Sequence, residues 1–427
     1  MNRNSLKCLL FSLMLVVLQV LFSSCSSDSD SHAPVSPSPL IVTEWNSLAL
    51  QVLAEGSVPN QYGTRALAMA HTAMFDAVNA IGQRYEPYHR DLAPLVAAGT
   101  SKAAAASAAA HRILTTLYPA QATAFDALYS AHLAAVADGV GKEAGILLGQ
   151  IAADEILLLR SNDGSAAAAA VPFPDGTEPG QWRRTDARPP QIPGWGAVAP
   201  WAMTTGQQFR MAGPPSLDSA SYAVAYQEVA DIGSAASASR TAEQTVIARF
   251  WMTGVPDHMF GIAMQMAEEK ALDIDDNARL FALMSMALAD ASICGWEMKY
   301  HYGFWRPVTA IREGESDGNP STIGDPAWNS LLAAPPFPEY VSGHSTTTAA
   351  GIGLLIRFHG GEDFDFIRTS LTPGLEPRSF SNLWAMAEEV GMSRIYGGIH
   401  FSFSNHDGLA AGRQLGEYVF DNFLQPR

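Results

Sequence analysis

The sequence is poor in cysteine and in charge of either sign. Three cysteines among 427 residues cannot form a disulfide framework. Only 16% of the residues are charged, and 42 acidic against 26 basic residues give a net charge of -16. An acidic surface repels polyanions, which excludes a general nucleic-acid binder. The 48% of hydrophobic residues exclude a disordered chain and suffice for a large core.

The N-terminus has the pattern of an export signal. Residues 1–24 combine a positive start at Arg3 and Lys7 with an apolar stretch and a small-residue end. Residues 25–42 form a linker rich in Ser, Pro and Asp. The segment resembles a bacterial lipoprotein signal, which implies that Cys25 is lipidated and becomes the mature N-terminus. We therefore expect an exported protein, in the periplasm or the outer membrane, that meets the membrane only through a lipid anchor.

The remaining chain shows helical periodicity from residue 43 onward. Apolar residues recur at spacings of three and four, as in RALAMAHTAMFDAVNAI, and no convincing strand pattern appears. The sequence therefore predicts an all-α fold. Residues 161–200 interrupt the pattern with Pro and Gly, and a connection of that length is often functional or packs across a surface. We expect an N-terminal helical region at 43–200 and a C-terminal one at 201–427.

Three segments between residues 290 and 410 carry the residues of a possible anion site. KYHYGFWRP holds Lys299 and Arg306, and Pro307 predicts that the helix ends at Arg306. YVSGHSTTT leads through Ser342, Gly343 and His344 into an apolar helix, whose free N-terminal amides favour anions. SRIYGGIHF holds Arg394 and His400.

As isolated motifs, these segments have simpler interpretations: a solvated face, an N-cap serine and a packed histidine. Together they supply the donors that hold a tetrahedral oxyanion, with a histidine to bind or attack its centre and another for acid–base chemistry. Cys294 lies in an apolar run and is expected to be a buried thiol.

The pattern K-x6-RP, SGH and SR-x5-H resembles the superfamily of vanadium-dependent haloperoxidases and type-2 phosphatidic acid phosphatases. The stretches RALAMAHTAMFDAVNAI and PPFPEYVSGHS resemble its bacterial haloperoxidase branch. The resemblance covers most of the chain from about residue 43. It implies helical bundles, and a vanadate cofactor whose site phosphate can also occupy.

The resemblance implies a role for each matching residue. His400 binds vanadium or attacks phosphorus, His344 is the acid–base residue, and Lys299 assists catalysis. The residues implied in binding the oxyanion are Lys299, Arg306, Ser342, Gly343, Arg394 and His400. Trp296 and Phe337 match substrate-pocket positions of chloroperoxidases.

Two positions depart from the family pattern. Val341 replaces the proline that usually precedes SGH. Ser404 replaces the acid often found four residues after the last histidine, so we expect Asp407 or a backbone carbonyl to orient His400.

Three functions remain open at this stage. A vanadate-dependent haloperoxidase oxidises halide with hydrogen peroxide to hypohalous acid. A phosphatase cleaves a phosphate ester through a phospho-histidine. A non-catalytic envelope lipoprotein only binds the anion. The haloperoxidase is preferred because the body is helical and long, with Trp296 and Phe337 in the pocket pattern. Ala-rich helices are compatible with a homodimer, which nothing in the sequence selects.

Overall fold

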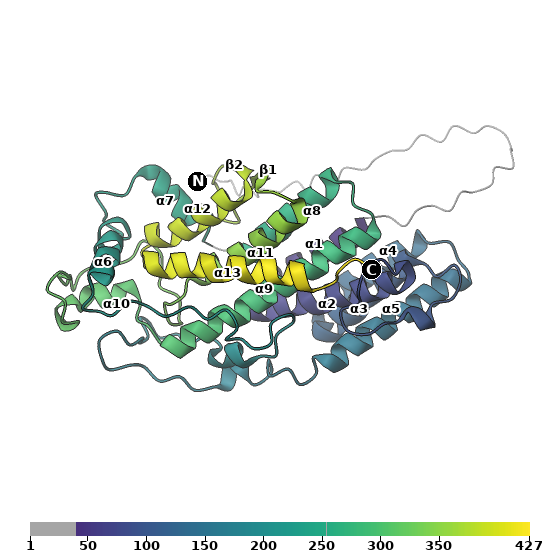
Figure 1. The fold of residues 1–427 in the computed structure, drawn as a ribbon, viewed down its shortest axis with the longest axis horizontal. Helices are drawn as coiled ribbons and strands as arrows, with labels where there is room; N and C mark the ends of the chain where they lie inside the picture. Colours follow the sequence, from purple (N-terminus) through teal and green to yellow (C-terminus); the bar gives the residue numbers. More distant parts are fainter. Residues whose placement is uncertain (1–39, 253) are drawn as a thin grey trace, which may run out of the picture. The chain divides into compact units, whose positions relative to one another are not determined.

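The computed structural model describes residues 40–252 and 254–427, which belong to one unit (Figure 1). The signal and most of the linker lie outside the described residues. The α-helices are α1 (Leu40–Glu55), α2 (Asn60–Gly82), α3 (Lys102–Leu117), α4 (Ala122–Ala134), α5 (Val140–Leu159), α6 (Ala220–Ile232), α7 (Ala242–Phe250), α8 (Val255–Glu269), α9 (Ile274–Tyr302), α10 (Pro307–Arg312), α11 (Gly343–His359), α12 (Leu383–Tyr396) and α13 (Ser402–Asn422). The predicted all-α class is confirmed.

Helix α9 is the central element of the fold. It packs against α2, α11, α13 and α8. In Figure 1, α9 runs between the end that holds α3, α4 and α5 and the end that holds α6 and α10. Among the described residues it is the one helix long and apolar enough to cross a membrane, and its apolar stretch is wholly buried inside the protein.

Two helix pairs are held by the same device, a glycine on one helix against a carbonyl of the other. A Cβ on Gly412 of α13 would lie 2.2 Å from the Thr346 oxygen of α11. A Cβ on Gly149 of α5 would lie 2.2 Å from the Ala105 oxygen of α3. Because no side chain fits there, the backbones approach closely. The pair α11–α13 positions two of the three predicted motifs.

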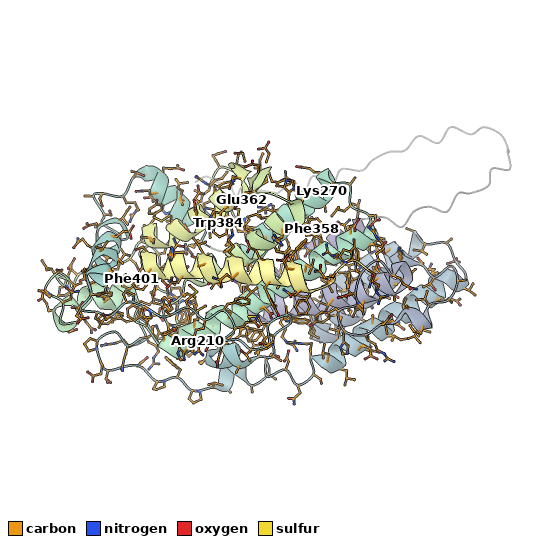
Figure 2. The ribbon with its side chains drawn as sticks, viewed as in Figure 1. Arg210, Lys270, Phe358, Glu362, Trp384 and Phe401 are labelled. Atoms are coloured by element: carbon orange, nitrogen blue, oxygen red, sulfur yellow. The ribbon has the colours of Figure 1, made fainter. Side chains whose placement is uncertain are left out.

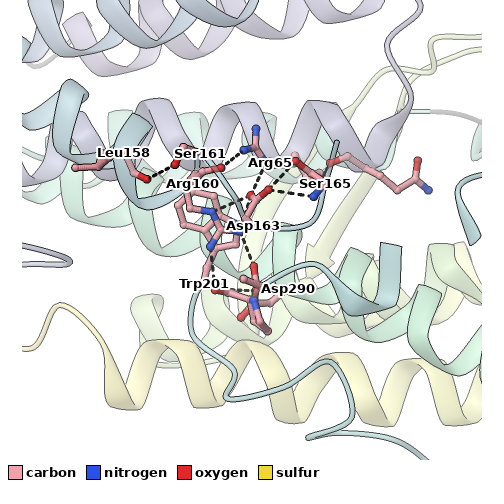
Figure 3. Close-up of polar contacts among 12 residues, drawn as sticks. Arg65, Leu158, Arg160, Ser161, Asp163, Ser165, Trp201 and Asp290 are labelled. Carbon is pink, nitrogen blue, oxygen red and sulfur yellow. Dashed lines mark hydrogen bonds and ion pairs between the residues drawn. The ribbon is translucent and has the colours of Figure 1, made fainter. Parts of the chain in front are cut away.

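The Pro- and Gly-rich segment after α5 packs across the surface, one of the two expectations for it. Arg160, at the end of α5, bonds to the carbonyls of Ala199 and Pro200 and lies 4.2 Å over the Trp201 ring (Figure 3). Asp290 of α9 accepts the backbone N–H groups of Trp201 and the two residues after it. The segment is thereby fastened to α9, next to the predicted site.

Several local expectations are confirmed. The Ser342 hydroxyl caps α11 by accepting from the Ser345 amide. Cys294 is fully buried, and burial raises the pKa of its thiol to about 12.

Other boundaries differ from the prediction. Helix α1 begins at Leu40, so it takes in the last three residues assigned to the linker. A hairpin of β1 (Asp363–Arg368) and β2 (Arg378–Asn382) lies between α11 and α12. Its signal was short, since DFDF alternates over only four residues.

Candidate active site

His400 lies in the short connection between α12 and α13, followed by Phe401, the N-cap residue of α13, which Figure 2 labels. Its side chain is buried, and each ring nitrogen has a partner. Nδ1 is 2.8 Å from the Glu339 carboxylate, and Nε2 is 3.3 Å from the Arg306 guanidinium. Because a guanidinium can only donate, Nε2 must carry the lone pair. His400 is therefore neutral in this arrangement, with its proton on Nδ1.

His344 lies in the first turn of α11, on the other side of the site. Its Nε2 is 3.1 Å from Arg394 Nη1, so this nitrogen also carries a lone pair. The ring is held from behind by a hydrogen bond to the Met252 carbonyl. Burial and the charge of Arg394 lower the pKa of His344 well below its usual range. Each histidine thus presents an unprotonated nitrogen beside an arginine.

The sequence predicted that the preceding helix ends at Arg306, and this prediction is wrong. Helix α9 ends at Tyr302, because Gly303 adopts a left-handed conformation with φ 56°. Arg306 is instead the N-cap residue of α10. Its side chain is fully buried and bonds to the carbonyls of Phe337 and Ile399, which carries the guanidinium to His400.

Lys299 lies beneath the loop that precedes α11. Its ammonium donates to the carbonyls of Pro338, Glu339 and Val341. It also lies 5.1 Å from the centre of the Phe337 ring. A direct contact with an oxyanion requires Lys299 to exchange one of these carbonyls for the ligand.

A cavity of about 420 Å³ opens onto these residues. Of the predicted residues, the cavity is lined by Trp296, Phe337, Gly343, His344, Arg394 and His400. Lys299, Arg306 and Ser342 lie behind its wall. Trp296 and Phe337 pack together, with ring centres 4.9 Å apart, and form an apolar side. The structure thus brings the three motif segments to one place.

The buried charges at the site are unbalanced. Lys299, Arg306 and Arg394 are no more than 1% exposed, and the Glu339 carboxylate is the acid that faces them. Burial lowers the pKa of Arg306 to about 10 and that of Arg394 to about 9. Burial, followed by the charge of Arg306, lowers the pKa of Lys299 well below its usual range. An anion in the cavity would relieve this imbalance.

Two guanidinium groups also have an unused donor. Arg306 Nη2 and Arg394 Nε are buried and lack a hydrogen-bond partner among the described residues. A buried donor without a partner costs about 1–3 kcal/mol, more for a charged group. They belong to the two guanidinium groups whose Nη1 atoms contact the lone-pair nitrogens of His400 and His344. The residues present therefore fit a tetrahedral oxyanion such as vanadate or phosphate.

Sequence reasoning missed some residues of the site. The Glu339 carboxylate is the partner of His400 Nδ1, so the expectation that Asp407 or a backbone carbonyl takes this place is wrong. Asp407 instead accepts from the Tyr340 hydroxyl at 2.6 Å. Gln191, from the long segment, lines the cavity with Asn60 and Gln61 from the start of α2. No sequence signal marks these contacts, since they depend on how distant segments pack.

Part of the chain is similar to known proteins. Residues 279–426 match the VCPO second helical-bundle domain. The vanadium chloroperoxidase of Curvularia inaequalis is 27% identical over 293 residues, which make up 52% of this chain and 47% of that protein. The chain therefore spans about half the length of this curated relative.

Solved structures extend the likeness over the rest of the chain. A bacterial vanadium-dependent iodoperoxidase has a TM-score of 0.77 and 25% identity, over 92% of this chain and 99% of its own. The holo form of a bacterial vanadium-dependent chloroperoxidase shares the fold, with a TM-score of 0.67 and 16% identity. The match covers 85% of this chain and 92% of that protein. The protein is thus an all-α protein with a buried candidate anion site. Its C-terminal part is similar to the second helical-bundle domain of vanadium chloroperoxidases, and its fold is that of the vanadium-dependent haloperoxidases compared above.

Proposed function

We propose that this protein is a vanadate-dependent haloperoxidase, which uses hydrogen peroxide to oxidise a halide to hypohalous acid. The observation that carries the proposal is the pair of unpartnered guanidinium donors beside two neutral histidines. Relatives named as a chloroperoxidase and an iodoperoxidase support it.

The residues divide into binding and proton-handling groups. Arg306, Arg394, the Gly343 amide and, after exchange of a carbonyl, Lys299 would hold the oxygens of vanadate, and His400 Nε2 would bind the metal. Bound vanadate supplies a Lewis acid that activates peroxide without changing oxidation state. His344 Nε2 carries a lone pair and can accept a proton from peroxide. The positive charge of the cluster stabilises negative charge that develops at the oxygens.

The apolar wall serves the second substrate. Trp296 and Phe337 exclude water from one side of the cavity while leaving room for a halide beside the cations. The donor set fits phosphate equally well, so hydrolysis of a phosphate ester through His400 is the competing activity.

A paired assay on the purified mature protein tests the proposal. One arm measures peroxide-dependent halogenation with chloride, bromide and iodide after addition of orthovanadate. The other measures hydrolysis of a small phosphate ester without vanadate. We expect halogenation with at least one halide, and its loss in His400→Ala. Hydrolysis without halogenation of any halide would contradict the proposal in favour of the phosphatase.

We also propose that the protein is exported and anchored through a lipid on Cys25. The support is the sequence pattern of residues 1–25 alone, which lie outside the described residues. Membrane fractionation of cells that express the wild-type protein and Cys25→Ser tests it. The wild-type protein should sediment with membranes and the variant should not; equal sedimentation of both would contradict a lipid anchor.

A further inference from the structure

We propose that Glu339 is the positioning residue of His400, in place of the acid expected at position 404. Its carboxylate keeps the imidazole proton on Nδ1 and so directs the Nε2 lone pair at the bound oxyanion. The inference rests on the proposed function only in assuming that vanadate binds at His400. Glu339 belongs to the loop before α11, whereas position 404 lies in α13.

The two partners of His400 define the direction of the hydrogen bond. Glu339 Oε1 is 2.8 Å from His400 Nδ1 and also accepts the Phe401 amide at 3.0 Å. Arg306 can only donate, so Nε2 carries the lone pair and the neutral ring has its proton on Nδ1. Nδ1 is therefore the donor to Glu339 Oε1, and the ring is held in one tautomer between the two side chains.

The backbone of Glu339 is also fixed in place. Its N–H donates to the Phe304 carbonyl, and its own carbonyl accepts from Lys299. The side chain is fully buried. One residue therefore ties the Lys299 ammonium to the His400 ring. A rigid support of this kind is what a ligand to a metal needs.

Neither Ser404, at the position where the family often has an acid, nor the nearby Asp407 provides a carboxylate to His400. Ser404 is buried, and neither its hydroxyl nor Glu339 Oε2 has a hydrogen-bond partner among the described residues. Ser404 therefore offers no carboxylate to His400. Asp407, one turn further along α13, is engaged by Tyr340. Among residues 40–252 and 254–427, no other carboxylate contacts His400.

Two substitutions separate the hydrogen bond from the charge. Glu339→Gln keeps an oxygen that can accept from Nδ1 but removes the negative charge. Glu339→Leu removes both. Asp290→Asn is a matched control. Asp290, on α9, is an equally buried carboxylate that accepts the backbone amides of Trp201 and Ala202 and does not contact the cations of the site.

The experiment measures equilibrium affinities for orthovanadate and for inorganic phosphate by calorimetry on the full mature chain. We expect Glu339→Leu to weaken vanadate binding by about 10- to 100-fold, the usual effect of losing the support of a metal-binding histidine. Phosphate, which the cations hold without a bond to histidine, should keep its affinity or gain some. Glu339→Gln should bind vanadate within about threefold of the wild type, and Asp290→Asn should leave both affinities unchanged.

Three results would overturn the inference. The first is wild-type vanadate affinity in Glu339→Leu. The second is an equal loss of vanadate and phosphate binding, which indicates a collapsed site. The third is a loss of vanadate affinity of about tenfold or more in Glu339→Gln. This third result also tests the inference if Glu339→Leu does not fold. The wild-type protein could lack halogenation activity while its variants show the predicted vanadate and phosphate affinities. That result would refute the proposed function and leave this inference intact.

Discussion

Two buried polar clusters in this protein contain the same kinds of residue but differ in how their hydrogen bonds are satisfied. In the first, Arg65 and Arg160 share the Asp163 carboxylate at 2.6 and 3.1 Å, and Ser165 donates to its other oxygen (Figure 3). Arg65 Nη2 and both Nη atoms of Arg160 bond to backbone carbonyls, such as that of Ala199. We call these four residues the closed cluster.

The second cluster comprises Lys299, Arg306, Arg394 and Glu339, which we call the open cluster. It sets three cations against one carboxylate and leaves two guanidinium donors unused among the described residues. No side chain in the closed cluster has such an atom. If all four groups are ionised and both histidines neutral, the open cluster carries a charge of +2, which matches a dianion. The closed cluster is completed by the chain itself, whereas the open cluster needs a ligand.

The largest effect is expected from removing a donor of the open cluster. Arg306→Ala should weaken phosphate or vanadate binding by about 30-fold to several thousand-fold, because losing one partner of a buried charged pair costs about 2–5 kcal/mol. Calorimetric titration measures the affinity. An affinity within threefold of the wild type would show that the anion does not bind beside Arg306.

The matching change in the closed cluster should affect stability and not binding. Arg160→Ala leaves Asp163 and two carbonyls with fewer partners, and breaking a buried ion pair costs about 3–5 kcal/mol. Denaturant unfolding of the ligand-free protein measures the loss of stability. We expect this loss to be larger for Arg160→Ala than for Arg306→Ala. Should Arg160→Ala weaken anion binding as much as Arg306→Ala, the two clusters would not be functionally distinct.

The open cluster could be predicted from the sequence largely because its residues lie in recognisable local motifs. Ser342, Gly343 and His344 start a helix, and a helix start is visible as a polar turn before an apolar run. His400 follows a Gly–Gly pair that ends the preceding helix. The closed cluster left no such trace, since Arg65, Arg160 and Asp163 look like ordinary surface charges on helices.

The errors within the open cluster have a common physical origin. The end of α9 was misplaced because Gly303 stops the helix before Pro307 can, and the left-handed cap outweighs the proline rule. Glu339 was overlooked because its partner lies 61 residues away. Contacts of this kind depend on how α13 docks onto α11, which no local pattern encodes.

Asp290 provides a test of intermediate size, because it adjoins the closed cluster without a direct ion pair. Burial raises the pKa of its carboxyl to about 6 from an ordinary 3.8. Between these values the folded protein binds a proton that the unfolded chain has lost, so this group's contribution to stability falls as pH rises from about 4 to 6. The fall should reach roughly 3 kcal/mol, at 1.36 kcal/mol per pKa unit.

The measurement is the difference in unfolding free energy between the wild type and Asp290→Asn at several pH values. The difference should shrink toward pH 6 and then level off, because the asparagine does not titrate. A constant difference across this range would mean that the Asp290 carboxyl stays charged inside the protein.

The smallest expected effect concerns two helix caps, one beside the open cluster and one at the protein surface. Ser342 caps α11 beside the open cluster, and Thr241 caps α7 in a capping box at the surface. Either residue changed to alanine should lower stability by about 1 kcal/mol, the usual value of a cap. Ser342→Ala should additionally weaken oxyanion binding by about two- to tenfold, since a neutral hydrogen bond contributes about 0.5–1.5 kcal/mol. Thermal unfolding with and without phosphate measures both quantities, and if the two variants respond to phosphate identically, Ser342 is only a cap.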